Sequence, residues 1–386
     1  MLLKAVLDYS EWVKTMEAHR GTLSSLRYTQ SLMDLLIFTI DNGIAWKDIF
    51  TLETLEAFKK YSRFKQASQA LIALSRFLFS HGQIDRPIEI PRPKTLLPDI
   101  YENYLLYQKQ RFLVSDGHSH NVRKVLSVFH DYLEREQLQL SALKIEHLDA
   151  FMAEFKVAPV TRRLYRYCLR GFLKYLYQEQ KILRKDLAPL LVGPPHVGQV
   201  KPPKFLRPGE VKNLFATLKL ATPVDIRTYA IVHLAYTLGL RPIEITRITL
   251  DDLTFSKGEL TLRQRKADNP ITLPIAKNTL KAVSAYVLKA RPKSPYRHLF
   301  LSFQPPFKPL SSYAVTLYIS RTMKQAGLSS TSYWLRHTYA QNLLEMGRSI
   351  YEIKEMMGHQ NIQTTRVYLH IDTKLMRKVL FDEELP

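Results

Sequence analysis

The stretch from Thr331 to Ile371 reads TSYWLRHTYAQNLLEMGRSIYEIKEMMGHQNIQTTRVYLHI and decides how the rest of the chain is interpreted. It brings Arg336, His359 and Tyr368 into one short region that is helical in pattern. The separations are 23 residues from arginine to histidine and 9 from histidine to tyrosine. An arginine and a histidine donate hydrogen bonds to phosphate oxygens, and a phenol is a nucleophile. The stretch therefore predicts a phosphate-handling site that carries its own nucleophile.

Charge and composition point to a polyanionic partner. The chain has 386 residues, of which 46% are hydrophobic and 24% charged, as in an ordinary globular protein of two or three domains. Its formal net charge is +21, which favours nucleic acid over anionic lipid because no amphipathic anchor or polybasic tail is evident. The longest apolar run, Tyr229 to Leu240, is too short to cross a bilayer.

Cysteine usage and the first residues suggest the compartment. Cys168 is the only cysteine, which excludes an intrachain disulfide and a cysteine-rich zinc site. Met1 to Tyr9 lacks the features of an export signal. We therefore expect a bacterial-type cytoplasm, with association to the nucleoid, and no membrane partner.

Proline-rich segments divide the chain. Residues 1–84 are predicted to be a helical module and residues 85–98, with four prolines, a linker. Residues 99–191 are predicted to form a second helical module and residues 192–205 a second linker. Residues 206–386 are predicted to be a separate domain, in which residues 207–210 open a helix and Ser311 or Ser312 caps another. Further helices are predicted at 225–238, 338–346 and 350–357, and a hairpin is formed by 259–264 and 271–275.

The two helical modules share a pattern. Leu52 to Phe58 aligns with Ile145 to Phe151 at an offset of 93 residues, through a common Glu-x-Leu-acidic-Ala-Phe motif. The apolar residues of 32–40, which we expect to form one helix face, meet apolar residues of 125–133 at the same offset. The match favours internal duplication over two unrelated helical segments.

A basic helix is predicted from Thr161 to Tyr177. Its cationic side chains are Arg162, Arg163, Arg166, Arg170 and Lys174, opposite a face that includes Leu169 and Phe172. A core helix with a solvated cationic back is one interpretation. Because no acidic residues interleave with these cations, we favour a DNA-facing surface.

Leu-Arg336-His-Thr, Met-Gly-His359 and Thr-Thr-x-x-Tyr368, with their spacing, resemble the second signature block of the tyrosine recombinases, the phage-integrase and Xer family. Gly-Leu-Arg241-x-x-Glu244 resembles the family's first arginine block. The resemblance implies that Arg241 and Arg336 grip the scissile phosphate, that His359 donates a hydrogen bond to it, and that Tyr368 attacks it. Glu244 would orient the guanidinium of Arg241.

Lys266 falls where the family places a lysine that protonates the departing sugar oxygen. The usual neighbouring glycines are replaced by Arg265 and Ala267, and a solvated hairpin lysine is the alternative interpretation. Tyr333 stands where the family usually has a histidine. A phenol is a poor proton acceptor, so general-base assistance should be weaker or differently routed. His337 directly follows Arg336 and points to a different helix face, so we expect it to be structural.

The fold that the resemblance implies is mainly α. It consists of a helical SAM-like core-binding module, here duplicated, and a mixed, mainly-α catalytic domain with a small β-sheet. The implied reaction is site-specific recombination of double-stranded DNA through a 3′-phosphotyrosyl intermediate, as in integration, excision, transposition or resolution. The family works without a cofactor or a metal, as a dimer to tetramer on DNA. After Tyr368, an apolar stripe of Leu375, Met376, Val379 and Leu380 is expected to pack in cis or on a neighbouring protomer.

Three alternatives remain open at this point. A type IB topoisomerase and a telomere resolvase use the same chemistry, and relaxation of a plasmid lacking any specific site would favour the former. A DNA-binding protein without catalytic activity is the third alternative. Retention of Arg241, Lys266, Arg336, His359 and Tyr368 together argues against it.

Overall fold

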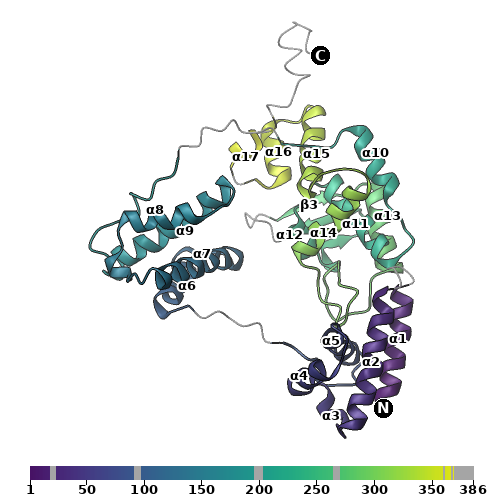
Figure 1. Cartoon of the computed structure of the whole chain (residues 1–386). Coiled ribbons are helices and arrows are strands. Elements are labelled where there is room, and N and C mark those ends of the chain that lie inside the picture. The colour runs from purple at the N-terminus through teal and green to yellow at the C-terminus, as the bar shows by residue number, and fades with distance from the viewer. Residues whose placement is uncertain are drawn as a thin grey trace. The chain divides into compact units, whose positions relative to one another are not determined.

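The computed structural model describes residues 1–17, 23–90, 97–194, 203–263, 270–359, 361–366 and 368. The chain is mainly helical and has one small three-stranded sheet, which confirms the predicted fold class (Figure 1). Its contacts separate residues 91–199 from a unit that contains residues 1–90 and 200–386. Lys266 and the stripe from Leu375 to Leu380 lie outside the described residues.

Residues 1–90 form a helical module with its own hydrophobic core. Its helices are α1 (Leu2–Glu17), α2 (Leu23–Asp41), α3 (Trp46–Ile49), α4 (Leu52–Tyr61) and α5 (Ala67–Ser80). The Thr51 hydroxyl accepts a hydrogen bond from the Thr54 amide and caps α4. Ile88 is still part of this core, so the module extends past the predicted boundary at residue 84.

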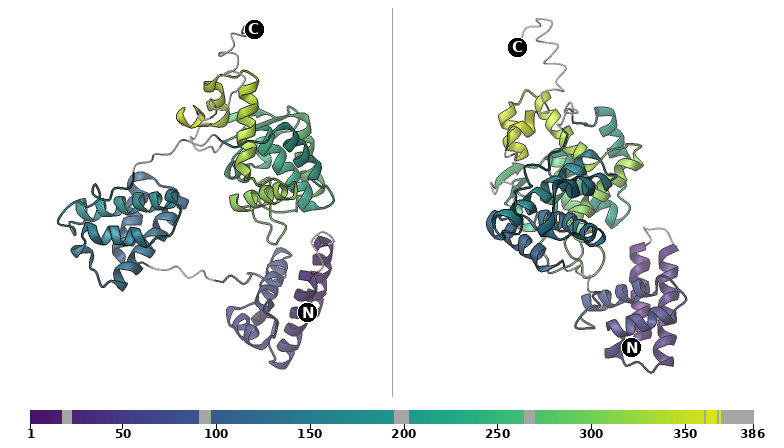
Figure 2. Two further views of the ribbon diagram at one scale, coloured as in Figure 1. Left: turned by 45° about the horizontal axis from the view of Figure 1, so that its top comes forward. Right: turned by 60° about the vertical axis from the view of Figure 1, so that its left-hand side comes forward.

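Residues 97–194 form the second helical module. It contains α6 (Asp99–Phe112), α7 (Asp116–Arg135), a 3₁₀ turn η1 (Leu140–Ala142), α8 (Ile145–Glu154) and α9 (Pro159–Gln178). Figure 2 shows these blue and teal helices packed on one another, with α7 against α6 and α9. The core begins at Leu97, which makes the segment between the two cores shorter than the predicted linker of 85–98.

The two modules have their helices in the same register. The first residues of α2 and α7 are 23 and 116, and those of α4 and α8 are 52 and 145, an offset of 93 in both cases. Leu32 and Leu35 in α2, and Val125 and Phe129 in α7, are all buried. The element order and the starts of these two pairs of helices therefore repeat with the offset of the sequence motif. The buried positions repeat only in part, since Leu35 aligns with the half-buried Val128 and Phe129 with the half-buried Leu36.

One part of the predicted apolar face of α2 is wrong. Leu32 and Leu35 are buried, but Met33 and Ile40 are exposed, Ile40 at 77%. Phe38 enters the core instead, where its ring packs against Phe58 and Tyr61 of α4. Ile40 and its aligned partner Leu133, which is buried, therefore differ in environment.

The part of the chain after residue 202 holds the remaining elements. Its helices are α10 (Pro208–Thr217), α11 (Pro223–Thr237), α12 (Pro242–Arg247), α13 (Lys277–Lys289), α14 (Ser312–Gln325), α15 (Ser332–Glu345), α16 (Ile350–Met357) and α17 (Gln363–Arg366). Its strands are β1 (Leu253–Thr254), after the turn η2 (Leu250–Asp252), β2 (Glu259–Leu262) and β3 (Ile271–Pro274). The strands pair antiparallel in the order β1-β2-β3, with Leu260 opposite Leu273.

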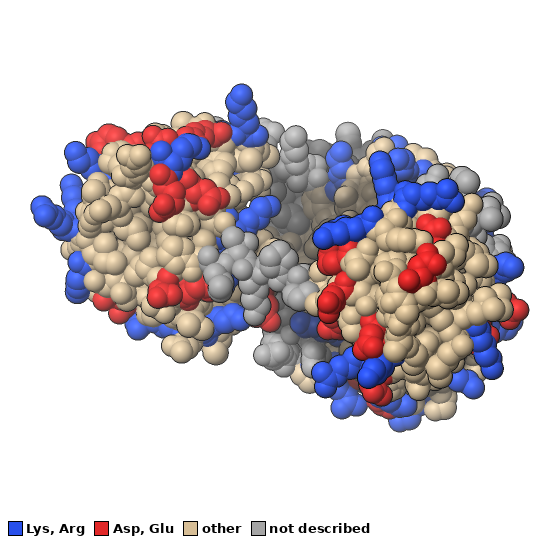
Figure 3. Space-filling model, turned by 60° about the horizontal axis from the view of Figure 1, so that its bottom comes forward, with Lys and Arg blue, Asp and Glu red and all other residues tan. Residues whose placement is uncertain are grey.

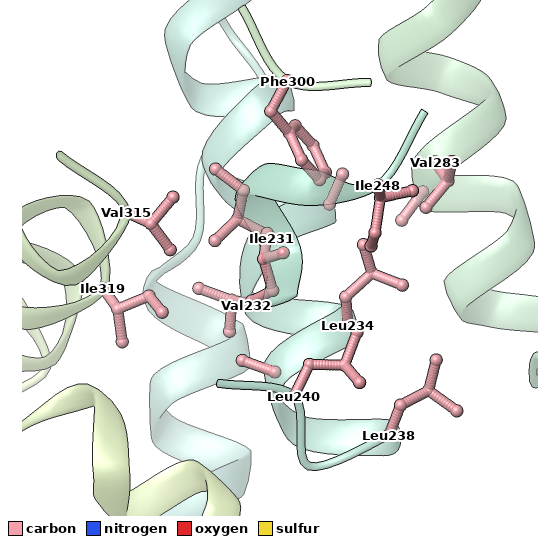
Figure 4. Packing of buried hydrophobic residues seen from close by; sticks show 14 of the residues in the cluster. Ile231, Val232, Leu234, Leu238, Leu240, Ile248, Val283, Phe300, Val315 and Ile319 are labelled. Carbon is pink, nitrogen blue, oxygen red and sulfur yellow. The ribbon is translucent and has the colours of Figure 1, made fainter. Parts of the chain in front are cut away.

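Helix α11 lies at the centre of this region. It is apolar on nearly all sides, as a helix surrounded by others must be. Ile231, Val232 and Leu234 are fully buried, and α13, α14 and α15 pack around the helix. Figure 4 shows these side chains pointing at Val283 of α13 and at Val315 and Ile319 of α14. This core fixes the turn that follows α11, which carries Gly239 and Arg241.

Helix α15 starts at Ser332, six residues before the predicted start at Thr338. The side chain of Thr338 ties it to the beginning of the domain, because its Oγ1 accepts a hydrogen bond from the Leu206 amide at 2.9 Å. The earlier start places Tyr333, Arg336 and His337 on one continuous helix. Arg336 therefore projects from a rigid element whose other side is packed on α11.

Candidate active site

Arg241 is held by the residue three positions after it. The side chain of Glu244 accepts a hydrogen bond from the Arg241 amide at 2.8 Å and another from its Nη1 at 2.7 Å. Arg241 is thus the N-cap residue of α12, and Glu244 completes a capping box there. The guanidinium also donates to the carbonyls of Met357 and Gly358 at the end of α16.

The carboxylate of Glu244 also lies close to the guanidinium of Arg336, a contact that the sequence did not predict. The carboxylate lies 3.8 Å from Nη1 of Arg336, and the Glu244 side chain is 2% exposed. One buried carboxylate therefore lies between two guanidinium groups. A buried charge persists only where it is paired and hydrogen-bonded, so Glu244 balances and orients both arginines.

Arg336 joins three segments that are distant in sequence. Its Nη1 donates to the carbonyl of Gly239 at 2.5 Å, and its Nη2 donates to the carbonyl of Met357 at 2.5 Å. Nη2 also lies 3.1 Å from Nε2 of His359. The side chain is 5% exposed. The guanidinium is therefore fixed by the turn after α11 and by the end of α16.

His359 follows Gly358, whose φ of 62° ends α16 in the left-handed conformation. A guanidinium has no acceptor, so Nε2 of His359 accepts the hydrogen bond from Arg336. The ring is buried, and its Nδ1 lies 2.8 Å from Oγ1 of Thr365, to which it donates if the ring is neutral. In this arrangement His359 is an acceptor at Nε2, whereas the resemblance implies a donor to phosphate. To donate from Nε2, the ring must release Arg336 and carry a proton on Nε2, either as the other neutral tautomer or as the imidazolium.

Tyr368 is packed within the same region. It is 2% exposed and belongs to a small apolar cluster with Tyr339, Ala340, Leu343, Ile353 and Met357. Burial raises the pKa of Tyr368 to about 12, while the positive charges of Arg336 and Arg241 act to lower it. The two arginines are therefore close enough to stabilise the phenolate electrostatically, but burial outweighs them in this state.

The sequence-based interpretation of His337 missed its contact with Tyr368. Its Nδ1 lies 2.8 Å from Oη of Tyr368, and the two rings lie 5.7 Å apart between centroids. Burial, and after it the charge of Arg336, lowers the pKa of His337 to about 4. The spacing along α15 does put His337 on a different side from Arg336. The segment that carries Tyr368 covers that side, and a helical pattern does not show this.

Tyr333 and the basic residues of α9 are the remaining predicted site residues that the structure describes. Tyr333 is 53% exposed near the start of α15, and its hydroxyl makes no hydrogen bond to any other residue that the structure describes. Of the basic residues on α9, Arg163, Arg170 and Lys174 are exposed. Nη2 of Arg162 donates to the carbonyl of Phe155 at 2.6 Å, and Arg166 lies against Gly193.

Gly239 provides the first prediction. Its φ is +60°, and a Cβ added there would lie 2.3 Å from the ring of Tyr339. We expect Gly239→Ala to cost about 1–2 kcal/mol for the backbone conformation and about 1–3 kcal/mol more for the clash. The guanidinium of Arg336 should also lose its position, because the Gly239 carbonyl accepts from it. Denaturant unfolding measures the stability change.

Gly347→Ala is the matched control. Gly347 has a φ of +76°, but nothing lies within 4 Å of a Cβ built there. It should lose only the backbone contribution, about 1–2 kcal/mol, and keep cleavage activity. Equal destabilisation of the two variants would contradict the close packing of Gly239 on Tyr339.

The known proteins that this chain resembles in sequence or fold are integrases and recombinases. Residues 204–374 match the Phage integrase family. The chain is 30% identical to y4rF of Sinorhizobium fredii over 250 residues, which are 61% of this chain and 59% of that protein. It is also 30% identical to tyrosine recombinase XerC of Pelotomaculum thermopropionicum over 233 residues, 58% of this chain and 73% of the relative.

The fold has a solved counterpart in the XerH site-specific recombinase, whose structure is a post-cleavage complex bound to a palindromic difH substrate. The TM-score is 0.58 at 17% identity, over 72% of this chain and 83% of that one. The described residues include no helix that is long and apolar enough to cross a membrane. On the sequence matches, with a fold that agrees, the chain belongs to the phage integrase family, the family of the tyrosine recombinases.

Proposed function

We propose that this chain is a site-specific DNA recombinase and that Tyr368 is its nucleophile. The observation that supports this most is that Tyr368 lies in the electrostatic field of two arginines, both held by the buried carboxylate of Glu244. Tyr368 attacks the scissile phosphate, forming a 3′-phosphotyrosyl bond and releasing a 5′-hydroxyl. A 5′-hydroxyl of another strand then attacks that bond and restores the phosphodiester.

The phosphate takes over hydrogen bonds that the arginines now make to the backbone. Arg336 and Arg241 both donate to carbonyls at the end of α16, at 2.5 Å and at 3.3–3.4 Å. A phosphodiester oxygen is a charged acceptor and forms a stronger hydrogen bond than a carbonyl. The guanidinium groups exchange these carbonyls for non-bridging oxygens, and they bind the additional charge that develops in the transition state.

In this proposal His359 and Lys266 also act directly on the substrate. Once Arg336 has turned to the phosphate, His359 donates to a phosphate oxygen from Nε2, in the tautomer or the imidazolium that carries a proton there. Lys266 supplies the proton that the 5′-oxygen takes up as it leaves. Because the phosphotyrosyl bond conserves the energy of the phosphodiester, neither a cofactor nor a metal is needed for strand exchange.

Double-stranded DNA with a specific recombination site is the partner that we propose. Residues 200–386 carry 28 Lys and Arg against 14 Asp and Glu, and residues 91–199 carry 17 against 11. Arg163, Arg170 and Lys174 of α9 supply exposed cations for the DNA backbone. Two to four copies of the chain, or a related recombinase, assemble on paired sites. Such an enzyme acts on the nucleoid of a bacterial-type cytoplasm.

Covalent capture tests this function without knowledge of the target. Sheared DNA from around the chain's own gene is incubated with the whole protein, and fragments that stay bound in detergent are sequenced. We expect one short sequence to be recovered and a nicked version of it to accumulate the adduct. Recovery of unrelated sequences, with relaxation of a plasmid that lacks the site, would indicate a topoisomerase. Adducts that convert to hairpin ends would indicate a telomere resolvase, and binding without an adduct a non-catalytic protein.

Residues 1–90 have a different charge balance from the rest. They carry 11 Lys and Arg against 10 Asp and Glu, so their formal net charge is only +1. Figure 3 shows Lys and Arg beside Asp and Glu across the whole face of the molecule that it presents, so the difference is one of net charge and not of a single one-signed patch. We propose that this module is a duplicate of residues 99–191 that has kept the helices but not the cationic face. Its contribution is then a contact with an extra duplex segment or with protein, outside the chemistry.

Deletion of residues 1–90 is therefore expected to leave cleavage of a nicked substrate within about tenfold of the full chain, since the catalytic side chains are all elsewhere. Site binding or assembly of the higher complex should weaken, which gel-shift titration measures. Unchanged binding and assembly in the deletion would reject a contact role for the module.

A further inference from the structure

In the hydrogen bond between His337 and Tyr368, the hydroxyl is the donor and the imidazole is the acceptor. The phenol of Tyr368 is protonated at neutral pH, because burial keeps its pKa high. His337 is neutral under the same conditions, because its pKa is low. A neutral imidazole has one unprotonated nitrogen, and a phenol donates readily. The tautomer with the proton on Nε2 leaves Nδ1 free to accept the Tyr368 hydroxyl proton across 2.8 Å.

We propose that His337 is the general base that takes the hydroxyl proton of Tyr368 when this tyrosine attacks the phosphate. The inference rests on the proposed function, in which Tyr368 is the nucleophile. His337 touches the reacting oxygen directly, so it is a catalytic residue in the strict sense. We assign the role of general base to His337 and not to Tyr333, because Tyr333 is exposed and a phenol is a poor proton acceptor at neutral pH.

The step balances without any further reactant. As the bond from Oη of Tyr368 to phosphorus forms, the proton on Oη passes to Nδ1 of His337. The bond from phosphorus to the 5′-oxygen breaks, and this oxygen receives a proton from Lys266. In the rejoining step an incoming 5′-hydroxyl gives its proton to Lys266, and the imidazolium of His337 returns its proton to the departing Tyr368 oxygen.

The bound phosphate makes this proton transfer easier. The positive charge of Arg336 is one cause of the low basicity of His337 in the free protein. A phosphodiester held by Arg336 and Arg241 brings a negative charge that offsets theirs. His337 therefore becomes a better base when the substrate is in place, and it stays neutral when the site is empty.

Two substitutions separate a base from a positioning residue. His337→Ala removes the acceptor, and we expect adduct formation to slow by about 10²–10³-fold. In His337→Asn, Oδ1 stands close to where Nδ1 was and accepts the hydrogen bond, but an amide does not take a proton at neutral pH. We expect His337→Asn to be as slow as His337→Ala. Recovery to within a fewfold of the unchanged protein would overturn the base role.

The acidity of the nucleophile provides a readout that folding defects do not imitate. Incorporation of 3,5-difluorotyrosine at position 368 lowers the pKa of the phenol, so the attack needs less help from a base. We expect this change to raise the rate of adduct formation by His337→Ala at least tenfold. No restoration would contradict the proposal.

A 5′-bridging sulfur in the substrate tests the other end of the reaction. A thiolate leaves without a proton, so the sulfur substrate should restore the cleavage rate of Lys266→Ala. On the same substrate, His337→Ala should remain slower than the unchanged protein by the same factor as on the ordinary substrate. Rescue of His337→Ala by sulfur would assign His337 to the leaving group and overturn the proposal. His298→Asn, a partly exposed histidine outside the site, should react at the unchanged rate.

The outcomes also separate the inference from the proposed function. If the unchanged protein forms no adduct on its recovered site, the function itself fails. If it forms an adduct that Tyr368→Phe abolishes, but His337→Ala forms it at the normal rate, the function stands and the role of His337 is overturned.

Discussion

Replacement of Tyr368 by phenylalanine is expected to abolish covalent adduct formation on a nicked site. The substitution removes only Oη, because a phenylalanine ring fills the same space beside Leu343, Ile353 and Met357. The lost hydrogen bond to His337 should cost about 0.5–1.5 kcal/mol of stability. DNA binding should stay within about twofold, since phosphate contacts and not the nucleophile supply most of the affinity. Gel electrophoresis in detergent measures the adduct and gel-shift titration the binding.

Tyr351→Phe is the matched control for this substitution. Tyr351 lies on α16 and is 71% exposed, away from the apolar cluster of Tyr368. Its loss of a hydroxyl should leave adduct formation unchanged. If Tyr368→Phe kept any substantial fraction of the adduct, another residue would have to be the nucleophile.

Glu244→Gln is expected to have the second largest effect. The carboxylate accepts from Nη1 of Arg241 at 2.7 Å and lies 3.8 Å from Nη1 of Arg336. An amide of the same size removes the negative charge and can direct an N–H group at a guanidinium. Loss of one partner from a buried ion pair costs about 3–5 kcal/mol, so unfolding should occur at clearly lower denaturant concentration.

Cleavage should fall by about 10³-fold in the Glu244→Gln protein that remains folded. Loss of one preorganised donor typically costs 10²–10³-fold, and here two arginines lose their orientation together. Single-turnover rates at low temperature, with folding checked by circular dichroism, measure the effect. Glu355→Gln, on the exposed surface of α16, should change neither rate nor stability. A Glu244→Gln enzyme of normal rate would show that Glu244 does not orient the arginines.

Local signals in the sequence predicted several elements correctly. Ser311 caps α14 through its hydroxyl, as Thr51 caps α4, because such caps depend only on neighbouring residues. The antiparallel pairing of β2 with β3 was predicted from two short apolar runs separated by a turn sequence. The pairing of Arg241 with Glu244 was implied by the resemblance to the family's first arginine block, and the two side chains lie 2.7 Å apart.

Features that depend on tertiary contacts were missed. Helical spacing put His337 on a different side of α15 from Arg336, but it did not reveal that Tyr368 returns to that side. The second partner of Glu244 is 92 residues away in sequence, beyond any periodic pattern. The acceptor role of His359 follows from the position of the Arg336 guanidinium, which no motif specifies. Ile40 is apolar at a helical spacing, and it is nevertheless exposed.

The most direct measurement identifies the amino acid that carries the DNA. Trypsin cleaves after Arg366 and Lys374, which releases a peptide of residues 367–374 in which Tyr368 is the only tyrosine. The trapped adduct is digested with trypsin and nuclease and analysed by mass spectrometry. The account predicts a nucleotide joined through its 3′-phosphate to Tyr368. A nucleotide on any other residue, or one joined through its 5′-phosphate, would contradict it.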